Sequence, residues 1–381
     1  MQKLRRLCLL LMLLLALTGC ISAWETVLID PEGTAMTVTR AELKEFAPFT
    51  NDDGAVPLER VLYAHGYRVI ETLQVSEAES SDATFAWPAV AEAALWHRSG
   101  EVEIDGERLR PARIEGQPAE ALGAVTVHLI DIAPTAAAAL GLSVPSQATG
   151  RAFASPPSVD HVLLLFIDGF GYLRYEEARD AGLIPNLVAL GEPQLGLAAY
   201  PPSTVVCSAA ILTGAPPEVN GVVDRGTTRK TEVETLFDVA AAAGLSVVAV
   251  EGDALAFNLR NAEITLSGDR DGNGSTDDNV LANALEVLQG PMPDLLWVHF
   301  HGIDDAGHAH GPGALEEEAA IAGVDTAIGE LLSTLPARTV VLIFADHGMH
   351  TVDEGERLGN HGNLIARDML VPVWLWQTPG G

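Results

Sequence analysis

The chain has 381 residues, a formal net charge of −30 at pH 7 and 48% hydrophobic residues. Its length allows one large or two ordinary domains, and its composition is that of a globular α/β protein with a substantial core. The negative charge argues against binding to a nucleic-acid polymer or an anionic membrane surface, because like charges repel. A small phosphorylated substrate stays compatible with this charge if bound metal ions create a local positive field.

The first 20 residues are typical of an export signal. A basic start precedes an uncharged apolar run at 7–17, which is shorter than the roughly 20 residues that span a bilayer. Residues 17–20 read Leu-Thr-Gly-Cys and resemble the lipobox of bacterial lipoproteins. We therefore expect a lipid anchor at Cys20 that holds the protein outside the cytoplasm on a bacterial membrane. The alternative is an ordinary cleaved signal with an incidental cysteine.

The three cysteines do not provide a disulfide framework. Cys8 lies in the leader and Cys20 at the expected anchor, which leaves Cys207. An exported protein of this kind must gain its stability from its core and from any bound metal.

Two regions follow the leader. Residues 21–120 contain short β-like runs at 25–29, 37–39 and 102–104 and a helical pattern at 57–65, which predict a small accessory α+β domain whose role the sequence does not indicate. Residues 121–381 alternate strand-like and helix-like patterns, which predicts a doubly wound, mostly parallel α/β sheet. Its expected strands are 162–167, 246–250, 295–300 and 339–345, and its expected helices are 235–243, 279–288 and 315–335.

Acidic and histidine side chains lie just beyond these apolar runs, in what we predict to be loops. Parallel sheets bind ligands at the carboxyl ends of their strands, so we expect these side chains to converge. Carboxylates and imidazoles are ligands for two borderline divalent metals, with zinc expected and manganese as the alternative. Any one of them alone would more often be a helix cap or a satisfied polar contact. The set is Asp168, Asp304, His308, Asp346, His347 and His361.

Thr204 is the candidate nucleophile. It is expected to begin a helix, where unpaired backbone N–H groups and the helix dipole favour an alkoxide and a bound phosphate. A metal on its oxygen would lower the hydroxyl pKa and activate it at neutral pH. A simple N-cap role is the alternative for this threonine, and Ser203 and Ser208 are rival hydroxyls.

With these residues in order, the chain resembles the type I phosphodiesterase/nucleotide pyrophosphatase branch of the alkaline phosphatase superfamily. The resemblance implies an alkaline-phosphatase-type fold and a covalent intermediate on Thr204. It also implies two metal sites. One would be held by Asp168, Thr204, Asp346 and His347, and the other by Asp304, His308 and His361.

A second resemblance concerns residues 125–153, which look like the closing strand and helix of alkaline-phosphatase-superfamily domains. In those proteins the segment follows the last metal-binding histidine, whereas here it precedes the first catalytic strand. We therefore predict a circular permutation, which neighbouring surface termini make physically tolerable. An unrelated strand–helix unit is the alternative.

The chain departs from the family pattern at two places. Nucleotide pyrophosphatases carry a phosphate-binding Asn three residues after the nucleophile, and Cys207 stands there in this chain. The span from His347 to His361 is also short, which leaves little room for a nucleotide-binding insertion. Sulfatases are disfavoured, because the residues after Cys207 lack their x-Pro-x-Arg pattern.

Residues 269–277 begin like a calcium-binding loop. Position twelve of such a loop would be Val280 instead of a bidentate Glu. An acidic surface turn is the preferred interpretation, with weak calcium binding as the alternative.

Together these features predict a two-zinc phosphoester hydrolase, most simply a phosphodiesterase of small molecules. A phosphomonoesterase or phosphonate hydrolase is the alternative among enzymes. A binding lipoprotein with a catalytically silent hydrolase fold is the alternative from another class.

Overall fold

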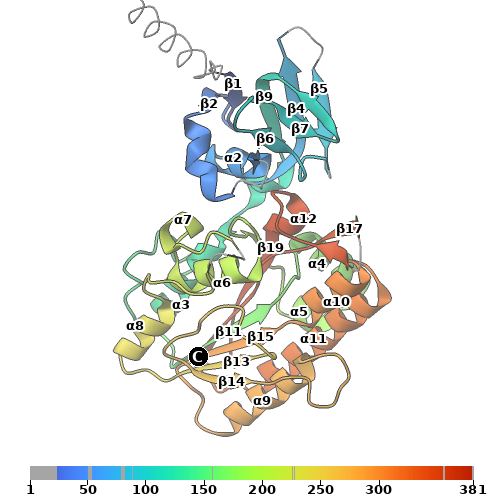
Figure 1. Cartoon of the computed structure of the whole chain (residues 1–381). Helices are drawn as coiled ribbons and strands as arrows, with labels where there is room; N and C mark the ends of the chain where they lie inside the picture. Colours follow the sequence, from blue (N-terminus) through green and yellow to red (C-terminus); the bar gives the residue numbers. More distant parts are fainter. Residues whose placement is uncertain are drawn as a thin grey trace, which may run out of the picture. The chain divides into compact units, whose positions relative to one another are not determined.

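The computed structural model describes residues 24–49, 54–78, 82–87, 89–156, 158–224, 226, 228–354 and 357–379. The expected leader and Cys20 lie outside this part of the chain. The chain divides into two compact units, one up to Ala119 and one from Glu120 onward (Figure 1). No helix of the described residues is both long and apolar enough to cross a membrane.

The first unit is built mainly from two β-sheets. One sheet has the strand order β2-β1-β9-β4-β5 and the other the order β3-β6-β7-β8. Buried Tyr67 ties two strands of the larger sheet together, because its hydroxyl donates to the Ile29 carbonyl and accepts from the Gly116 N–H. Burial raises the pKa of this phenol, so it stays a neutral donor.

The elements of this unit are β1 Glu25–Ile29, β2 Ala35–Thr39, the 3-10 helix η1 Glu42–Phe49, β3 Ala55–Pro57, α2 Leu58–Ala64, β4 Ile70–Glu77, β5 Ala83–Ala86, β6 Ala94–Trp96, β7 Val102–Ile104, β8 Glu107–Leu109 and β9 Pro111–Pro118. The runs predicted at 25–29, 37–39 and 102–104 are strands, and the helix predicted at 57–65 is α2.

The second unit contains an eight-stranded sheet with the order β10-β12-β19-β16-β11-β15-β13-β14. Neighbouring strands pair in parallel, except that β19 is antiparallel to both β12 and β16. The central strands β11, β15 and β16 are buried along almost their whole length, as expected where helices cover both faces of a sheet. All seven residues of β16 are buried. The predicted mostly parallel α/β fold is confirmed.

The elements up to β14 are η2 Glu120–Ala124, β10 Val127–His128, η3 Leu129–Asp131, α3 Ile132–Ala139, β11 His161–Ile167, α4 Tyr172–Asp180, α5 Pro185–Ala189, β12 Gln194–Leu197, α6 Thr204–Thr213, α7 Pro217–Asn220, α8 Leu236–Ala242, β13 Val247–Glu251 and β14 Glu263–Leu266. The later elements are α9 Asp277–Gln289, β15 Leu295–Phe300, α10 Gly302–His310, α11 Leu315–Thr334, β16 Thr339–Ala345, β17 His350–Glu354, β18 Arg357–Asn360, α12 Ala366–Met369 and β19 Leu370–Gln377.

The helices of this unit form two groups. Helix α6 contacts α3, α7 and α8, whereas α11 contacts α5, α9 and α10. Figure 1 shows the two groups on opposite sides of the strands. A buried ion pair fixes α4 to α11, because Arg174 donates from Nε to both carboxylate oxygens of Glu317 at 2.8 and 3.0 Å. This pair ties α4 to α11, and α11 in turn contacts α10.

The segment 125–153 belongs to this second unit. Strand β10 pairs with β12, and η3 and α3 contact α6. The Gly150 N–H donates to the Gly214 carbonyl at the end of α6, and a Cβ on Gly150 would lie 2.0 Å from the Ile130 carbonyl oxygen. The segment therefore supports the helix that begins at Thr204. Circular permutation stays a prediction.

Candidate functional site

Asp168 occupies the position directly after strand β11. Its backbone N–H donates to the Phe300 carbonyl at 2.9 Å, which holds the ends of β11 and β15 together. Gly169 follows with a φ of +73°, and a Cβ at this position would lie 2.9 Å from the Cβ of Asp304. A glycine here lets helix α10 bring Asp304 close to Asp168.

Asp346 and His347 follow strand β16 and are both fully buried. The imidazole Nε2 of His347 lies 3.2 Å from Asp346 Oδ2 and 3.4 Å from Asp168 Oδ1. Asp346 Oδ1 accepts N–H groups from Gly169 and His347. Among the described residues, Asp346 Oδ2 has no hydrogen-bond donor. Burial and the neighbouring carboxylates of Asp168 and Asp304 raise the pKa of Asp346 well above its usual value, and a nearby positive charge would favour its ionised form.

Thr204 is the first residue of α6, as predicted. Its Oγ1 lies 3.5 Å from Asp168 Oδ1 and 3.5 Å from His347 Nε2. Ser203, in an extended conformation, occupies the N-cap position, so the N-cap alternative does not describe Thr204. The threonine hydroxyl therefore faces two candidate ligands at the positive end of a helix.

Asp304 and His308 lie one turn apart on helix α10. His308 Nε2 is 3.3 Å from Asp304 Oδ2, and His361 Nε2 is 3.9 Å from Asp304 Oδ1. The prediction of a loop at 304–308 was wrong. The carboxylate of Asp277 accepts the N–H groups of His301 and Gly302 and so starts a helix directly after β15.

The three predicted histidines share one hydrogen-bond pattern. Each Nδ1 lies 2.8–3.0 Å from a backbone carbonyl, that of Gly359 for His308, Gly348 for His347 and Pro202 for His361. A carbonyl only accepts, so each Nδ1 carries a proton and each neutral ring keeps its Nε2 lone pair. Burial lowers the pKa of His361 well below its usual value, which favours the neutral form. This is the arrangement of metal-binding histidines oriented by a second partner.

The spacing of these atoms also fits metal binding. Ligand atoms about 2.0–2.2 Å from a tetrahedral zinc ion lie about 3.3–3.6 Å from one another. The two predicted ligand sets contain clusters of such atoms, Asp168 with Asp346 and His347, and Asp304 with His308 and His361. The residues therefore fit two divalent cations.

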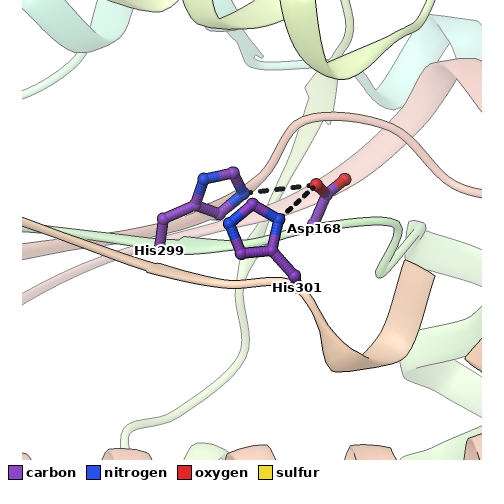
Figure 2. A group of neighbouring side chains, drawn as sticks. All are labelled: Asp168, His299 and His301. Atoms are coloured by element: carbon purple, nitrogen blue, oxygen red, sulfur yellow. Dashed lines mark hydrogen bonds and ion pairs between the residues drawn. The ribbon is translucent and has the colours of Figure 1, made fainter. Parts of the chain in front are cut away.

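Three groups beside Asp168 were missed by the sequence analysis, and two of them, His299 and Glu251, are buried. His299 lies in strand β15, His301 directly before α10, and Glu251 at the end of the neighbouring strand β13. Figure 2 shows both imidazole rings directed at the Asp168 carboxylate. His299 Nε2 is 3.2 Å and His301 Nδ1 is 3.5 Å from Asp168 Oδ2. The signal was the alternation of His299 and His301 at the end of an apolar run.

These groups shift one another's protonation. Burial opposes the charge on Asp168, but hydrogen bonds from His299 and His301 hold its pKa well below its usual value. Burial likewise lowers the pKa of His301, but the carboxylates of Asp168 and Glu251 outweigh this effect and raise it well above the usual value. The site thus gathers positive charge around Asp168.

A cavity of about 180 Å³ opens beside Thr204. Its lining includes Ser203, Thr204, Arg229, Asp253, His301 and His361. Such a cavity gives a small substrate access to the threonine hydroxyl and to the exposed edge of His301.

Residues 162–374 match the family of type I phosphodiesterases and nucleotide pyrophosphatases. The chain belongs to this family. Its members are metal-dependent phosphoester hydrolases, and the matched segment contains all seven predicted site residues.

Among curated proteins, the chain is similar to parts of much longer ones. It is 33% identical over 102 residues to the mouse GPI ethanolamine phosphate transferase 3 catalytic subunit. The aligned segment covers 27% of this chain and 9% of the mouse protein. It is 29% identical over 105 residues to GPI ethanolamine phosphate transferase 3 of Eremothecium gossypii, covering 27% of this chain and 10% of that protein. The chain thus spans about a tenth of the length of these relatives.

Among solved structures, the chain is similar to phosphonoacetate hydrolase from Sinorhizobium meliloti 1021. The complex with phosphonoformate matches at 21% identity and a TM-score of 0.40. The match covers 50% of this chain and 56% of the hydrolase. The complex with phosphonoacetate matches at 18% identity and the same TM-score. This match covers 52% of this chain and 58% of the hydrolase.

The acidic turn at 269–277 has its carboxylates engaged with the backbone. Asp269 accepts N–H groups from Gly272, Asn273 and Gly274, and Asp277 caps α10. Among the described residues, this turn does not form a cluster of three convergent carboxylate or histidine ligands. These contacts agree with the preferred interpretation of a surface turn.

We predict that Asp304→Asn and His361→Gln each lower the zinc content by about one ion per chain. Both variants remove a ligand from the same proposed site, whereas His310→Gln, an exposed histidine on α10, should leave the zinc content unchanged. Metal analysis of dialysed protein by inductively coupled plasma mass spectrometry measures the effect. Equal zinc in all four proteins would contradict this ligand set.

Proposed function

We propose that the protein is a two-metal phosphodiesterase of small molecules with Thr204 as its nucleophile. The observation that carries the proposal is the position of Thr204 Oγ1, 3.5 Å from both Asp168 Oδ1 and His347 Nε2 at the mouth of the cavity. An N-cap role does not explain this position, because Ser203 is the N-cap residue.

The proposed ligand sets follow the two clusters. Asp168, Thr204, Asp346 and His347 would hold one ion, and Asp304, His308 and His361 the other. When bound, zinc or manganese ions would lower the pKa of the Thr204 hydroxyl and offset the charge of the phosphate. The mixed carboxylate and imidazole set favours such borderline ions over magnesium or calcium.

The reaction proceeds in two displacements. The Thr204 hydroxyl gives its proton to solvent and Oγ attacks phosphorus, while the bond from phosphorus to the leaving ester oxygen breaks and that oxygen takes one proton back from solvent. A water molecule then attacks the phosphothreonine phosphorus, breaks the bond to Thr204 Oγ and returns its proton to that oxygen. The products are an alcohol and a phosphate monoester.

The substrate is proposed to be small. The cavity beside Thr204 encloses about 180 Å³, and the chain carries a net charge of −30. Together they favour a small ester, whose charge the metals neutralise locally, over a phosphate polymer that the whole protein would repel.

The test of the proposed function is turnover of a p-nitrophenyl phosphodiester by zinc-loaded protein. Thr204→Ala should lower kcat by about 10³-fold or more, because no other group replaces the nucleophile. Thr204→Ser, which keeps a hydroxyl, should retain measurable turnover. Undiminished turnover by Thr204→Ala would exclude this nucleophile. Faster cleavage of the matching monoester would indicate a phosphatase, and zinc binding without turnover of either ester would favour a silent binder.

Ser203 is proposed to help bind the phosphate where the family's Asn is missing. Its Oγ is buried, lines the cavity and has no hydrogen-bond partner among the described residues. Cys207 is fully buried, donates weakly to the Ala199 carbonyl at 3.6 Å and does not line the cavity. Burial raises the pKa of its thiol well above the usual value, so Cys207 stays neutral and packs in the core.

We therefore expect Ser203→Ala to lower kcat/KM by about 10–100-fold, the usual effect of losing a hydrogen bond to a charged group. Cys207→Ala should change kcat/KM by less than about threefold, because its side chain does not line the cavity. Steady-state kinetics on the same diester compare the two variants. The reverse order of effects would assign phosphate binding to Cys207 instead.

We also propose that a lipid on Cys20 anchors the protein outside the cytoplasm to a bacterial membrane. The support is the Leu-Thr-Gly-Cys sequence after an apolar run. In bacteria grown with radiolabelled palmitate, the full chain should carry label and sediment with membranes, whereas Cys20→Ala should do neither. An unlabelled wild-type protein would contradict the anchor.

A further inference from the structure

We propose a third divalent cation site in the second unit, formed by Asp168 Oδ2, His299 Nε2 and His301 Nδ1. These atoms lie within 4.8 Å of one another. The site shares Asp168 with the proposed function but uses the other carboxylate oxygen, because Oδ1 faces Thr204 and His347.

Glu251 determines which ring nitrogens of His299 and His301 are available to bind a metal ion. Its Oε2 lies 2.9 Å from His299 Nδ1 and 3.3 Å from His301 Nε2. A carboxylate only accepts, so these two nitrogens carry protons. The opposite nitrogen of each ring, which faces Asp168, is then the one with a lone pair in the neutral imidazole. A carboxylate that orients two ring nitrogens in this way is typical of metal-binding histidines.

The distances are compatible with ligand spacing. His299 Nε2 and His301 Nδ1 are 3.2 and 3.5 Å from Asp168 Oδ2, which is longer than the roughly 2.7–2.9 Å of charge-assisted hydrogen bonds. Ligand atoms around a tetrahedral zinc ion are about 3.3–3.6 Å apart. The atoms of the two sites proposed above are 3.2–3.9 Å apart.

The surrounding structure holds the three groups in place. His299 stacks on Phe166 with a centroid distance of 3.7 Å and an interplanar angle of 4°. Trp297 Nε1 donates to Glu251 Oε1 at 2.7 Å. A Cβ on Gly252 would lie 2.8 Å from His301 Cδ2, so only a glycine allows the ring to pack there. These contacts preorganise the carboxylate and both rings.

Two imidazole nitrogens and one carboxylate oxygen suit zinc, manganese, iron(II) or cobalt(II) better than magnesium or calcium. The side chain of His301 is 19% exposed and lines the cavity beside Thr204. An ion held by His301 would therefore lie beside the cavity, where water or a substrate oxygen could reach it.

The test counts metal ions in the purified full chain after dialysis against zinc. We expect about three ions per wild-type chain and about two in His301→Gln, which removes a ligand nitrogen but keeps an amide that can donate to Glu251. Glu251→Gln should weaken the third ion about 10–100-fold. His310→Gln is the matched control and should bind three. An anomalous difference map should show a peak about 2.0–2.2 Å from Asp168 Oδ2.

The outcomes separate this inference from the proposed function. Two ions in both wild type and His301→Gln would overturn the third site and leave the two-metal site intact. A fall from two ions to one in His301→Gln would overturn it as well, because His301 would then belong to one of the two proposed sites. The proposed function is tested without reference to His301. Its two tests are the loss of one ion in His361→Gln and the dependence of turnover on Thr204.

Discussion

The burial of several carboxylates at one edge of the sheet is the constraint on which the second unit depends. Atoms of Asp168 and Asp346 lie within 4.8 Å of each other, and both residues are at most 3% exposed. Two negative charges at this distance repel by about 3 kcal/mol even at an effective dielectric constant of 20. Hydrophobic packing of β11 and β16 keeps them together, so positive charge must be supplied at this edge.

The fold supplies part of that charge and leaves room for the rest. Helix α6 directs its N-terminal N–H groups at the site, and the histidines present ring nitrogens to the carboxylates. The histidine rings themselves are held by backbone carbonyls and by Glu251. Neutral ligands oriented in this way bind a cation with little reorganisation, so metal affinity and the stability of the folded unit are linked.

The sequence predicted most of this arrangement because apolar runs and polar ends are local signals. Asp168 and Asp346 each follow a strand that is buried on both faces, and Thr204 begins α6 as expected. The helical position of Asp304 was missed because the cap that starts α10 comes from Asp277, the first residue of α9. Glu251 was missed for a similar reason, since its partners His299 and Trp297 belong to another strand.

Strand periodicity explains how one strand builds both a core and a site. Trp297 and His299 lie two residues apart on β15, so they face the same side of the sheet, and both hydrogen-bond to Glu251 on the adjacent strand β13. On the other side, His299 hydrogen-bonds to Asp168, which directly follows the neighbouring strand β11. The register of three parallel strands therefore sets the orientation of the Asp168 carboxylate. Its Oδ1 faces Thr204 and His347. Its Oδ2 faces His299 and His301.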